Sequence, residues 1–271
     1  MARSNPAGGD AKDAVSAGAG DGSSSHDSGV TASDALSSAD HALSLYDLLH
    51  QRQLRESAAE IAAAIAHAMG TPLNVISGRA ELIRQDPARA AAQAVKIEEQ
   101  VRTMASGLRQ LVDYLAPPEP AAPGVPARSV FEEALTLIEP LAERHGIVIA
   151  SDVAALDGIA VQRWHLLSNL VTLVSLAIRC AARTTREDQR RVLLHAAQDG
   201  GNLVLEIDVA DLEVLENWQL DKFHARPLPA AASDDYRVLS VCASIARGNG
   251  GRLGLEAITG GARLRLLCRA A

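Results

Sequence analysis

Apolar residues recur every three or four positions over two long stretches in the first half of the chain. This alternation is typical of an amphipathic helix, because about 3.6 residues make one turn. We expect the first helix from 39 to 85 and the second from about 88 to 116, after a turn at Asp86-Pro87. The first stripe comprises Leu54, Ala58, Ile61, Ile65, Met69, Pro72, Ile76, Ala80 and Ile83. The second comprises Ala94, Ile97, Val101, Met104, Leu108, Leu111 and Leu115.

Two long helices joined by a tight turn form a hairpin whose apolar stripe is too large to leave in water. A pair of hairpins buries such a stripe as a four-helix bundle, so the pattern predicts a homodimer. In the alternative arrangement, the hairpin lies against the second half of its own chain.

The second half of the chain mixes helical and strand patterns. Ser129 with Glu132 predicts a capping box that opens a helix ending near Arg144. Further helices are expected at about 162–182 and 235–248, and strands at 146–151, 192–198, 203–209, 252–257 and 262–268. The predicted fold is therefore α plus α/β: a helical hairpin followed by an α/β sandwich with helices on one face of a sheet.

These patterns divide the chain into four segments. Residues 1–38 are mostly Ala, Gly, Ser and Asp and are expected to be a disordered tail, because they bring too little apolar surface to offset the entropy of ordering. Residues 39–116 are the hairpin, and the Pro-rich residues 117–127 are a linker. Residues 128–271 are the α/β domain.

Composition excludes several classes of function. The net charge is −7 with dispersed Lys and Arg, which gives no positive surface for nucleic acid. No apolar run approaches the roughly 18 residues of a membrane span, and the N-terminus lacks the apolar core of a signal peptide, so we expect a cytoplasmic protein that does not bind a membrane. Cys180, Cys242 and Cys268 are far apart in apolar runs and are expected to be buried reduced thiols.

His67 lies in the run Ala66-His67-Ala68-Met69-Gly70-Thr71-Pro72-Leu73, two residues after Ile65 of the first stripe. Two residues turn a helix by about 200°, so His67 is expected to face solvent. Thr71 and Asn74 follow on the same exposed side. Pro72 lacks a backbone donor and should kink the helix one turn past the histidine.

This run resembles the phosphoacceptor box of two-component sensor histidine kinases, and with the order of elements that follows, the resemblance covers about 39–271. It implies that His67 accepts a phosphoryl group, that a response regulator receiver domain is the partner, and that Thr71 aids dephosphorylation of the regulator. Ala68 stands where the family has the acid that serves as a base in the ATP-dependent step.

The nucleotide boxes of the family are degenerate in this chain. The resemblance aligns Asn169 with the first Asn of the box that holds Mg²⁺ and phosphates, but Leu173 replaces the second and offers no oxygen ligand. Asp211 aligns with the adenine-binding Asp, without the glycines that follow it in the family. Tyr236 and Val238 stand where glycines would cradle the phosphates. The segment 212–234, which would close over a nucleotide, is expected to be a packed loop.

The favoured reading is a pseudokinase that exchanges phosphate between His67 and a receiver, or aids regulator dephosphorylation, and requires no cofactor of its own. A second reading is an active ATP-dependent protein-histidine kinase, which would use ATP and Mg²⁺ through Asn169 and Asp211. In a third, the protein is a non-enzymatic dimeric docking module. No motif in the sequence predicts a resident metal site.

Overall fold

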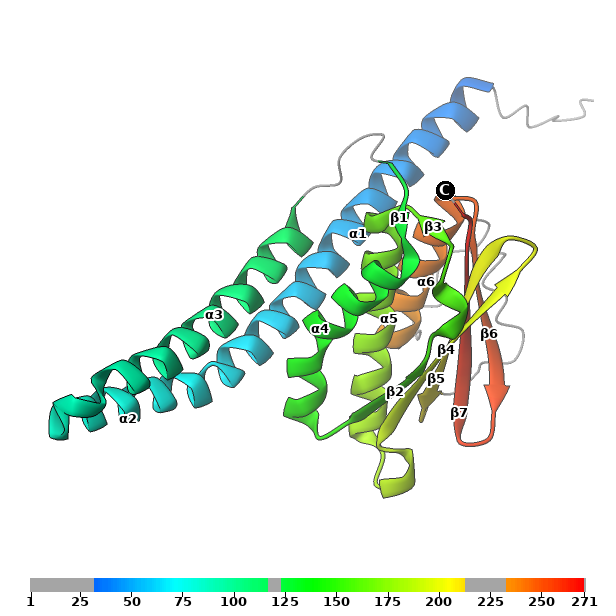
Figure 1. The fold of residues 1–271 in the computed structure, drawn as a ribbon. Coiled ribbons are helices and arrows are strands. Elements are labelled where there is room, and N and C mark those ends of the chain that lie inside the picture. Colours follow the sequence, from blue (N-terminus) through cyan, green and yellow to red (C-terminus); the bar gives the residue numbers. More distant parts are fainter. Residues whose placement is uncertain (1–31, 117–122, 213–232, 271) are drawn as a thin grey trace, which may run out of the picture. The chain divides into compact units, whose positions relative to one another are not determined.

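A helical hairpin forms the first half of the described chain (Figure 1). The structure is a computed structural model and describes residues 32–116, 123–212 and 233–270. The hairpin consists of α1 (Ala32–Ala68), α2 (Gly70–Gln85), the 3-10 turn η1 (Pro87–Arg89) and α3 (Ala90–Leu115). At the turn, the Asp86 carboxylate accepts a hydrogen bond from the backbone N–H of Ala88 at 3.2 Å. The predicted hairpin and its turn are confirmed.

Contacts divide the chain into two units, Met1–His41 and Ala42–Ala271. The first unit contains the start of α1, because this helix begins at Ala32 and not at the predicted residue 39. The prediction of a disordered tail is therefore wrong for residues 32–38, because adding residues to an existing helix costs little once the helix is nucleated. Residues 1–31 lie outside the described residues.

The second half of the chain is built on a five-stranded sheet in the order β2-β4-β5-β7-β6. Its strands are β2 (Val148–Asp152), β4 (Arg191–Asp199), β5 (Asn202–Ala210), β6 (Arg252–Ile258) and β7 (Gly261–Cys268). Strand β2 pairs parallel to β4, and the other neighbours pair antiparallel. Three helices cover one face of the sheet: α4 (Ala127–His145), α5 (Arg163–Arg183) and α6 (Asp234–Gly248) (Figure 1). The predicted α/β sandwich is confirmed, and we call residues 123–270 the lobe.

Short elements connect the main ones. Strand β1 (Val125–Pro126) pairs with β3 (Ala160–Val161), so the end of the predicted 117–127 linker is a strand, and residues 117–122 lie outside the described residues. The 3-10 turns η2 (Ala154–Leu156) and η3 (Glu187–Gln189) complete the lobe. The predicted capping box is wrong, because α4 already begins at Ala127. Ser129 lies in its first turn and donates to the Pro126 carbonyl at 2.8 Å.

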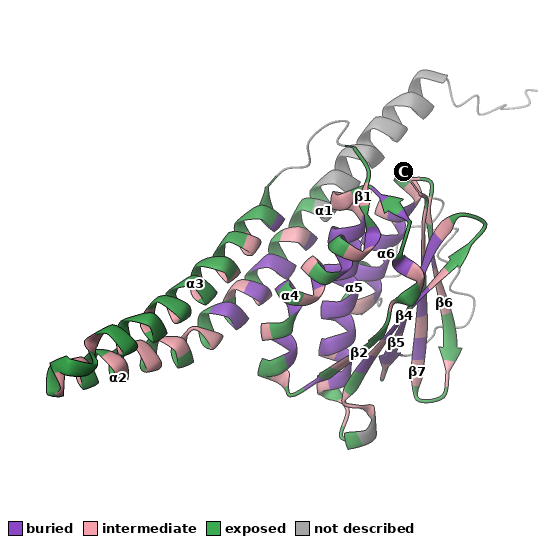
Figure 2. Cartoon of the chain, viewed as in Figure 1, coloured by how far each residue is buried: buried purple, intermediate pink, exposed green. Residues whose placement is uncertain are grey.

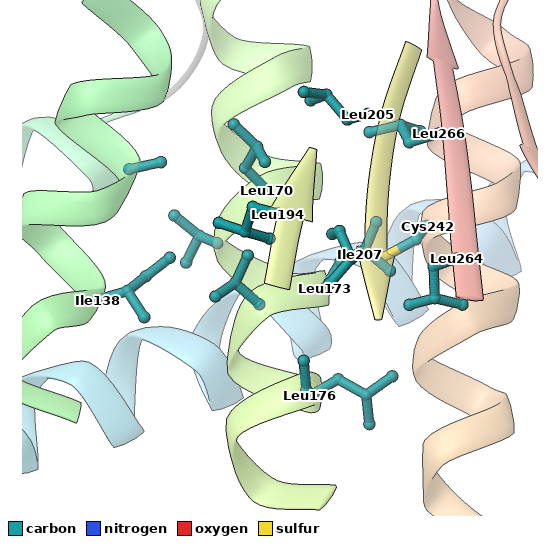
Figure 3. Packing of buried hydrophobic residues seen from close by; sticks show 14 of the residues in the cluster. Ile138, Leu170, Leu173, Leu176, Leu194, Leu205, Ile207, Cys242, Leu264 and Leu266 are labelled. Carbon is teal, nitrogen blue, oxygen red and sulfur yellow. The ribbon is translucent and has the colours of Figure 1, made fainter. Parts of the chain in front are cut away.

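The core lies between the sheet and its helices. Side chains from alternate positions of the central strands meet α5 there, among them Leu194, Ile207 and Leu264 (Figure 3). Helix α5 is buried along most of its length, from Leu166 to Ile178, whereas α2 has no buried residue (Figure 2). A helix that is apolar on all sides needs cover on all sides, so α5 must be covered on the side away from the sheet as well.

Two described helices are long and apolar enough to cross a membrane by length and composition alone, Gln51–Gln85 and Arg163–Arg183. The second is the core helix α5, with 83% of its most apolar window buried in the protein. Core helices pass this test as readily as membrane spans do, so the expectation of a cytoplasmic protein stays a prediction.

Candidate functional site

His67 lies in the last turn of α1 and is exposed, as the helical pattern predicts. On other sides of the same helix, Ile61 is 0% exposed and Ile65 is 7% exposed. Thr71 and Asn74 of α2 are exposed as well. A partner protein therefore has access to the imidazole of His67 and to the Thr71 hydroxyl.

The helix is interrupted at Met69, between α1 and α2. Because Pro72 has no N–H, it cannot donate to the carbonyl four residues earlier, that of Ala68. Met69 still donates to the Ile65 carbonyl at 2.9 Å, and Leu73 donates to the Met69 carbonyl at 3.1 Å. The predicted kink thus exists, but it falls in the turn before the proline, two residues after His67.

The hairpin shares its core with the lobe. Ala58, Ile61, Ala64 and Ile65 of α1 and Tyr114 of α3 belong to the same buried cluster as the lobe residues. Tyr114 is 3% exposed. Its hydroxyl lies toward Thr172 of α5 without reaching hydrogen-bonding geometry, and burial raises the pKa of the phenol. The hairpin therefore covers part of the outer side of α5, which is the arrangement that the sequence analysis gave as the alternative to a dimeric four-helix bundle.

An ion pair crosses the same boundary. Arg179 of α5 donates from Nη1 to Oε2 of Glu60 in α1 at 2.6 Å. The two side chains are 26% and 36% exposed. Sequence patterns did not identify this pair, because nothing in either helix specifies which helix lies opposite.

Leu173 fills the position where the family has its second Asn. Its side chain is 0% exposed and lies between α5 and the sheet, in the packed layer of Figure 3. A buried leucine provides neither an oxygen ligand for Mg²⁺ nor space for a phosphate.

The start of α6 does not form a phosphate cradle. Tyr236 is 3% exposed and Val238 is 6% exposed, so both side chains are packed into the lobe. The first turn also carries Asp234 and Asp235, and Asp235 pairs with Arg183 at 2.6 Å. Carboxylates at a helix N-terminus satisfy its positive end and repel a phosphate. The resemblance pointed to the missing glycines. The sequence analysis did not use the two adjacent aspartates at the start of α6, although they can be read directly from the sequence.

The two residues that the resemblance aligns with a nucleotide site, Asn169 and Asp211, lie toward opposite ends of α5. Asn169 is 2% exposed, and its Nδ2 donates to the His165 carbonyl at 2.9 Å. Asp211 is exposed, adopts a φ of 57° and interacts electrostatically with Arg183 near the end of α5. Residues 169 and 183 are separated by about 20 Å along the helix axis. The described residues of the lobe therefore do not fit a nucleotide with Mg²⁺. Most of the expected lid, residues 213–232, lies outside the described residues.

Asn169 borders a small cavity of about 40 Å³ between α5, α6 and β7. His165 and Asn249 also line it, and the Asn169 Oδ1 and His165 Nδ1 atoms are buried without a hydrogen-bond partner among the described residues. Burial lowers the pKa of His165, because the charged ring loses its hydration. This cavity is large enough for a water molecule but far too small for a nucleotide.

A larger hollow of about 390 Å³ lies on the face of the sheet away from the helices. Asp152, His195, Glu206, Asp208 and Arg263 are among its lining residues. Arg263 already pairs with Asp208 at 2.6 Å, and His195 lies 3.5 Å from Asp152. Its charged groups are thus largely paired with one another.

The described part of the chain contains neither a cluster of metal ligands nor a cysteine that burial leaves reactive. No group of three His, Cys, Asp or Glu residues is placed there to hold a metal ion. Cys180 and Cys242 are buried as predicted, whereas Cys268 is only partly buried. Burial raises the pKa of Cys180 to about 11 and that of Cys242 to about 12, so both remain thiols near neutral pH.

Comparison with known proteins identifies the hairpin. Residues 57–115 match the family model of the His Kinase A (phospho-acceptor) domain. This segment contains His67 and most of the hairpin. The hairpin is therefore similar to the phospho-acceptor domain of histidine kinases, in agreement with the resemblance of its sequence.

Solved structures that match the chain include kinases and a phosphotransferase. The histidine kinase AdeS of Acinetobacter baumannii is 15% identical, with 75% of this chain and 98% of that chain covered and a TM-score of 0.41. A bacterial phosphotransferase is 12% identical, with 78% and 95% covered and a TM-score of 0.41. The catalytic domain of the histidine kinase ThkA is 14% identical, with 54% and 94% covered and a TM-score of 0.45. No curated protein matches the sequence.

Proposed function

We propose that the chain is a histidine phosphotransfer protein whose kinase lobe has lost its nucleotide site. His67 exchanges a phosphoryl group with the aspartate of a response regulator receiver domain, and Thr71 aids dephosphorylation of the same regulator. A difference in burial supports the proposal. His67 is exposed, whereas Leu173, Tyr236 and Val238 are buried at the positions where a nucleotide would need metal ligands and space.

The chemistry requires no base at Ala68. A ring nitrogen of neutral His67 attacks the phosphorus of the receiver's acyl phosphate, and the bond from phosphorus to the carboxylate oxygen breaks. The receiver's aspartate leaves with the electron pair of that bond, and the other ring nitrogen loses its proton to water. An acyl phosphate is already a reactive donor, so the transfer does not need ATP, and Mg²⁺ is supplied by the receiver.

A homodimer is part of the proposal. The outward side of α3 carries Val101, Leu108, Val112 and Leu115, which are between 48% and 64% exposed. These four lie within about 60° of one another around the helix axis and form one apolar stripe. Such a stripe is stable in water only when a second surface covers it, and the same stripe of a second copy provides a matching surface.

Phosphotransfer from receivers tests this function. Receiver domains of the same organism, labelled with radioactive acetyl phosphate, are incubated with the wild-type chain and with the His67→Gln variant. We expect label to move from at least one receiver to the wild type and never to the variant. If no receiver transfers, or if transfer persists in His67→Gln, the docking-module reading replaces phosphotransfer.

A matched variant tests Thr71. Thr71→Ala should leave labelling of His67 unchanged and slow the loss of label from the receiver. Equal rates of receiver dephosphorylation in the wild type and in Thr71→Ala would contradict a role for this hydroxyl.

A further inference from the structure

The Arg179–Glu60 ion pair joins segments 119 residues apart in the sequence, α5 of the lobe and α1 of the hairpin. Both side chains are about two-thirds or more buried, and the contact of 2.6 Å is a charge-assisted hydrogen bond. Bonds of this kind are directional, whereas apolar contacts are not. The pair therefore fixes a geometry that the neighbouring alanine and isoleucine contacts leave less well defined.

Glu60 and His67 lie on the same side of α1. Seven residues separate them, which is close to two full turns and about 10 Å along the axis. Ile61, Ala64 and Ile65 form the adjacent buried side that faces the shared core. The ion pair thus lies at the border of the buried side, in line with the phosphoacceptor.

The docked part of the hairpin helix ends just before His67. Ile65 is the last buried residue of α1, the helix is interrupted at Met69, and α2 has no buried residue. The direction of the His67 ring therefore depends on how the two preceding turns are held. A rotation of α1 by about 20° would move a side chain at the helix surface, roughly 5 to 6 Å from the axis, by about 2 Å.

We infer that Arg179 is a positioning residue for phosphotransfer. Its ion pair with Glu60 fixes the rotation of α1 about its own axis and thereby orients the His67 ring toward the receiver. In this role the lobe holds the phosphoacceptor helix α1 in a fixed rotation, and it does not bind a nucleotide. In-line attack needs the reacting atoms about 3 Å apart, so a shift of 1 to 2 Å costs about tenfold or more in rate. This inference rests on the proposed function.

The test compares single-turnover transfer from a phosphorylated receiver to five forms of the full chain. These are the wild type, Glu60→Gln, Arg179→Gln, the reversed pair Glu60→Arg with Arg179→Glu, and Arg183→Gln. Arg183 lies one turn further along α5 and pairs with Asp235 inside the lobe, so it is the matched control for loss of an ion pair. The maximal rate and the half-saturating concentration are measured separately, and thermal melting monitors folding.

We expect Glu60→Gln and Arg179→Gln each to lower the maximal rate about tenfold with little change in the half-saturating concentration of the receiver. The docking surfaces are intact in both variants, and only the orientation of His67 is lost. The reversed pair should recover most of the rate, and Arg183→Gln should match the wild type. Unchanged rates in the single variants, an equal loss in Arg183→Gln, or no recovery in the reversed pair would each overturn the inference. If the wild type itself takes no label from any receiver, the proposed function fails instead.

A second phosphoryl donor distinguishes an effect on the orientation of His67 from an effect on the reactivity of its ring. Phosphoramidate is a small donor that needs no docking, so it should phosphorylate His67 at the same rate in the wild type and in Arg179→Gln. A loss of rate with this donor as large as with the receiver would show that the variant alters the ring itself, and would overturn the positioning role.

Discussion

Ile65 and His67 lie two residues apart on α1 and have opposite environments: Ile65 is 7% exposed in the core shared with the lobe, and His67 is exposed. The lobe therefore holds α1 up to the turn that carries His67, the proposed phosphoacceptor. Beyond Met69 the hairpin offers exposed polar and apolar side chains to partners.

The dimer is tested on the outward stripe of α3. Leu108→Asp combined with Val112→Asp should give a folded monomer, because both residues are exposed in the single chain and two charges in an apolar interface cost several kcal/mol. Light scattering at micromolar concentration measures the mass. A wild-type chain that is already monomeric under these conditions would refute the bundle.

Leu111 provides the control for this experiment. It is only partly buried but packs against the chain's own core. Leu111→Asp should therefore lower the melting temperature of the chain, whereas the outward double variant should leave the intrachain packing intact. Equal destabilisation by both would mean that the stripe faces the chain's own core.

The loss of the second Asn is not repaired by restoring it. Leu173→Asn should give no binding of ATP with Mg²⁺, since Tyr236, Val238 and the acidic first turn of α6 stay in place. The variant should also lose about 3 kcal/mol of unfolding free energy, because it removes buried apolar volume and buries an amide. Urea unfolding measures the loss. Leu82→Asn, at an exposed leucine of the hairpin, should change stability by less than about 0.5 kcal/mol.

His165 predicts a pH dependence of stability. Burial lowers its pKa in the folded chain below the usual 6.5, so the unfolded chain binds the proton more readily. Stability from this group is fully present above about pH 6.5 and is lost as the pH falls toward the folded-state pKa. His165→Gln should flatten the fall in urea midpoint between about pH 7.5 and 5. Identical slopes in the wild type and in His165→Gln would contradict this role of His165.

Exposure of His67 predicts that the ring itself contributes little to folding. His67→Gln should keep the melting temperature and the dimer while losing the label from receivers. Ala68→Glu should keep both as well, and should not produce autophosphorylation from ATP, because we propose that Leu173, Tyr236 and Val238 remove the nucleotide site independently of residue 68. Labelling of Ala68→Glu by ATP would show that the acid was the missing element.

Much of the fold follows from periodicity. The hairpin, its turn at Asp86-Pro87 and the elements of the lobe lie close to their predicted ranges, because apolar spacing directly reflects helix and strand geometry. The interruption at Met69 was expected later, because the lost hydrogen bond of a proline lies in the preceding turn. The pairing of β1 with β3 was missed, since two-residue strands leave no periodic signal.

Which surface covers each apolar stripe could not be read from the sequence. Ile61 and Leu108 belong to equally regular stripes, yet Ile61 is buried within the chain and Leu108 is 48% exposed. Periodicity identifies the apolar side of a helix, but it does not identify the surface that buries this side. The Arg179–Glu60 contact was unpredictable for the same reason, as it depends on the docking of α1 against α5.

Calorimetric titration of the full chain with ATP and Mg²⁺ tests most directly the claim that the lobe has lost its nucleotide site. We expect no heat of binding up to about millimolar nucleotide, because Leu173 removes a metal ligand and the start of α6 is filled by side chains and carboxylates. Micromolar affinity would contradict the account and would favour the second interpretation, an active ATP-dependent histidine kinase.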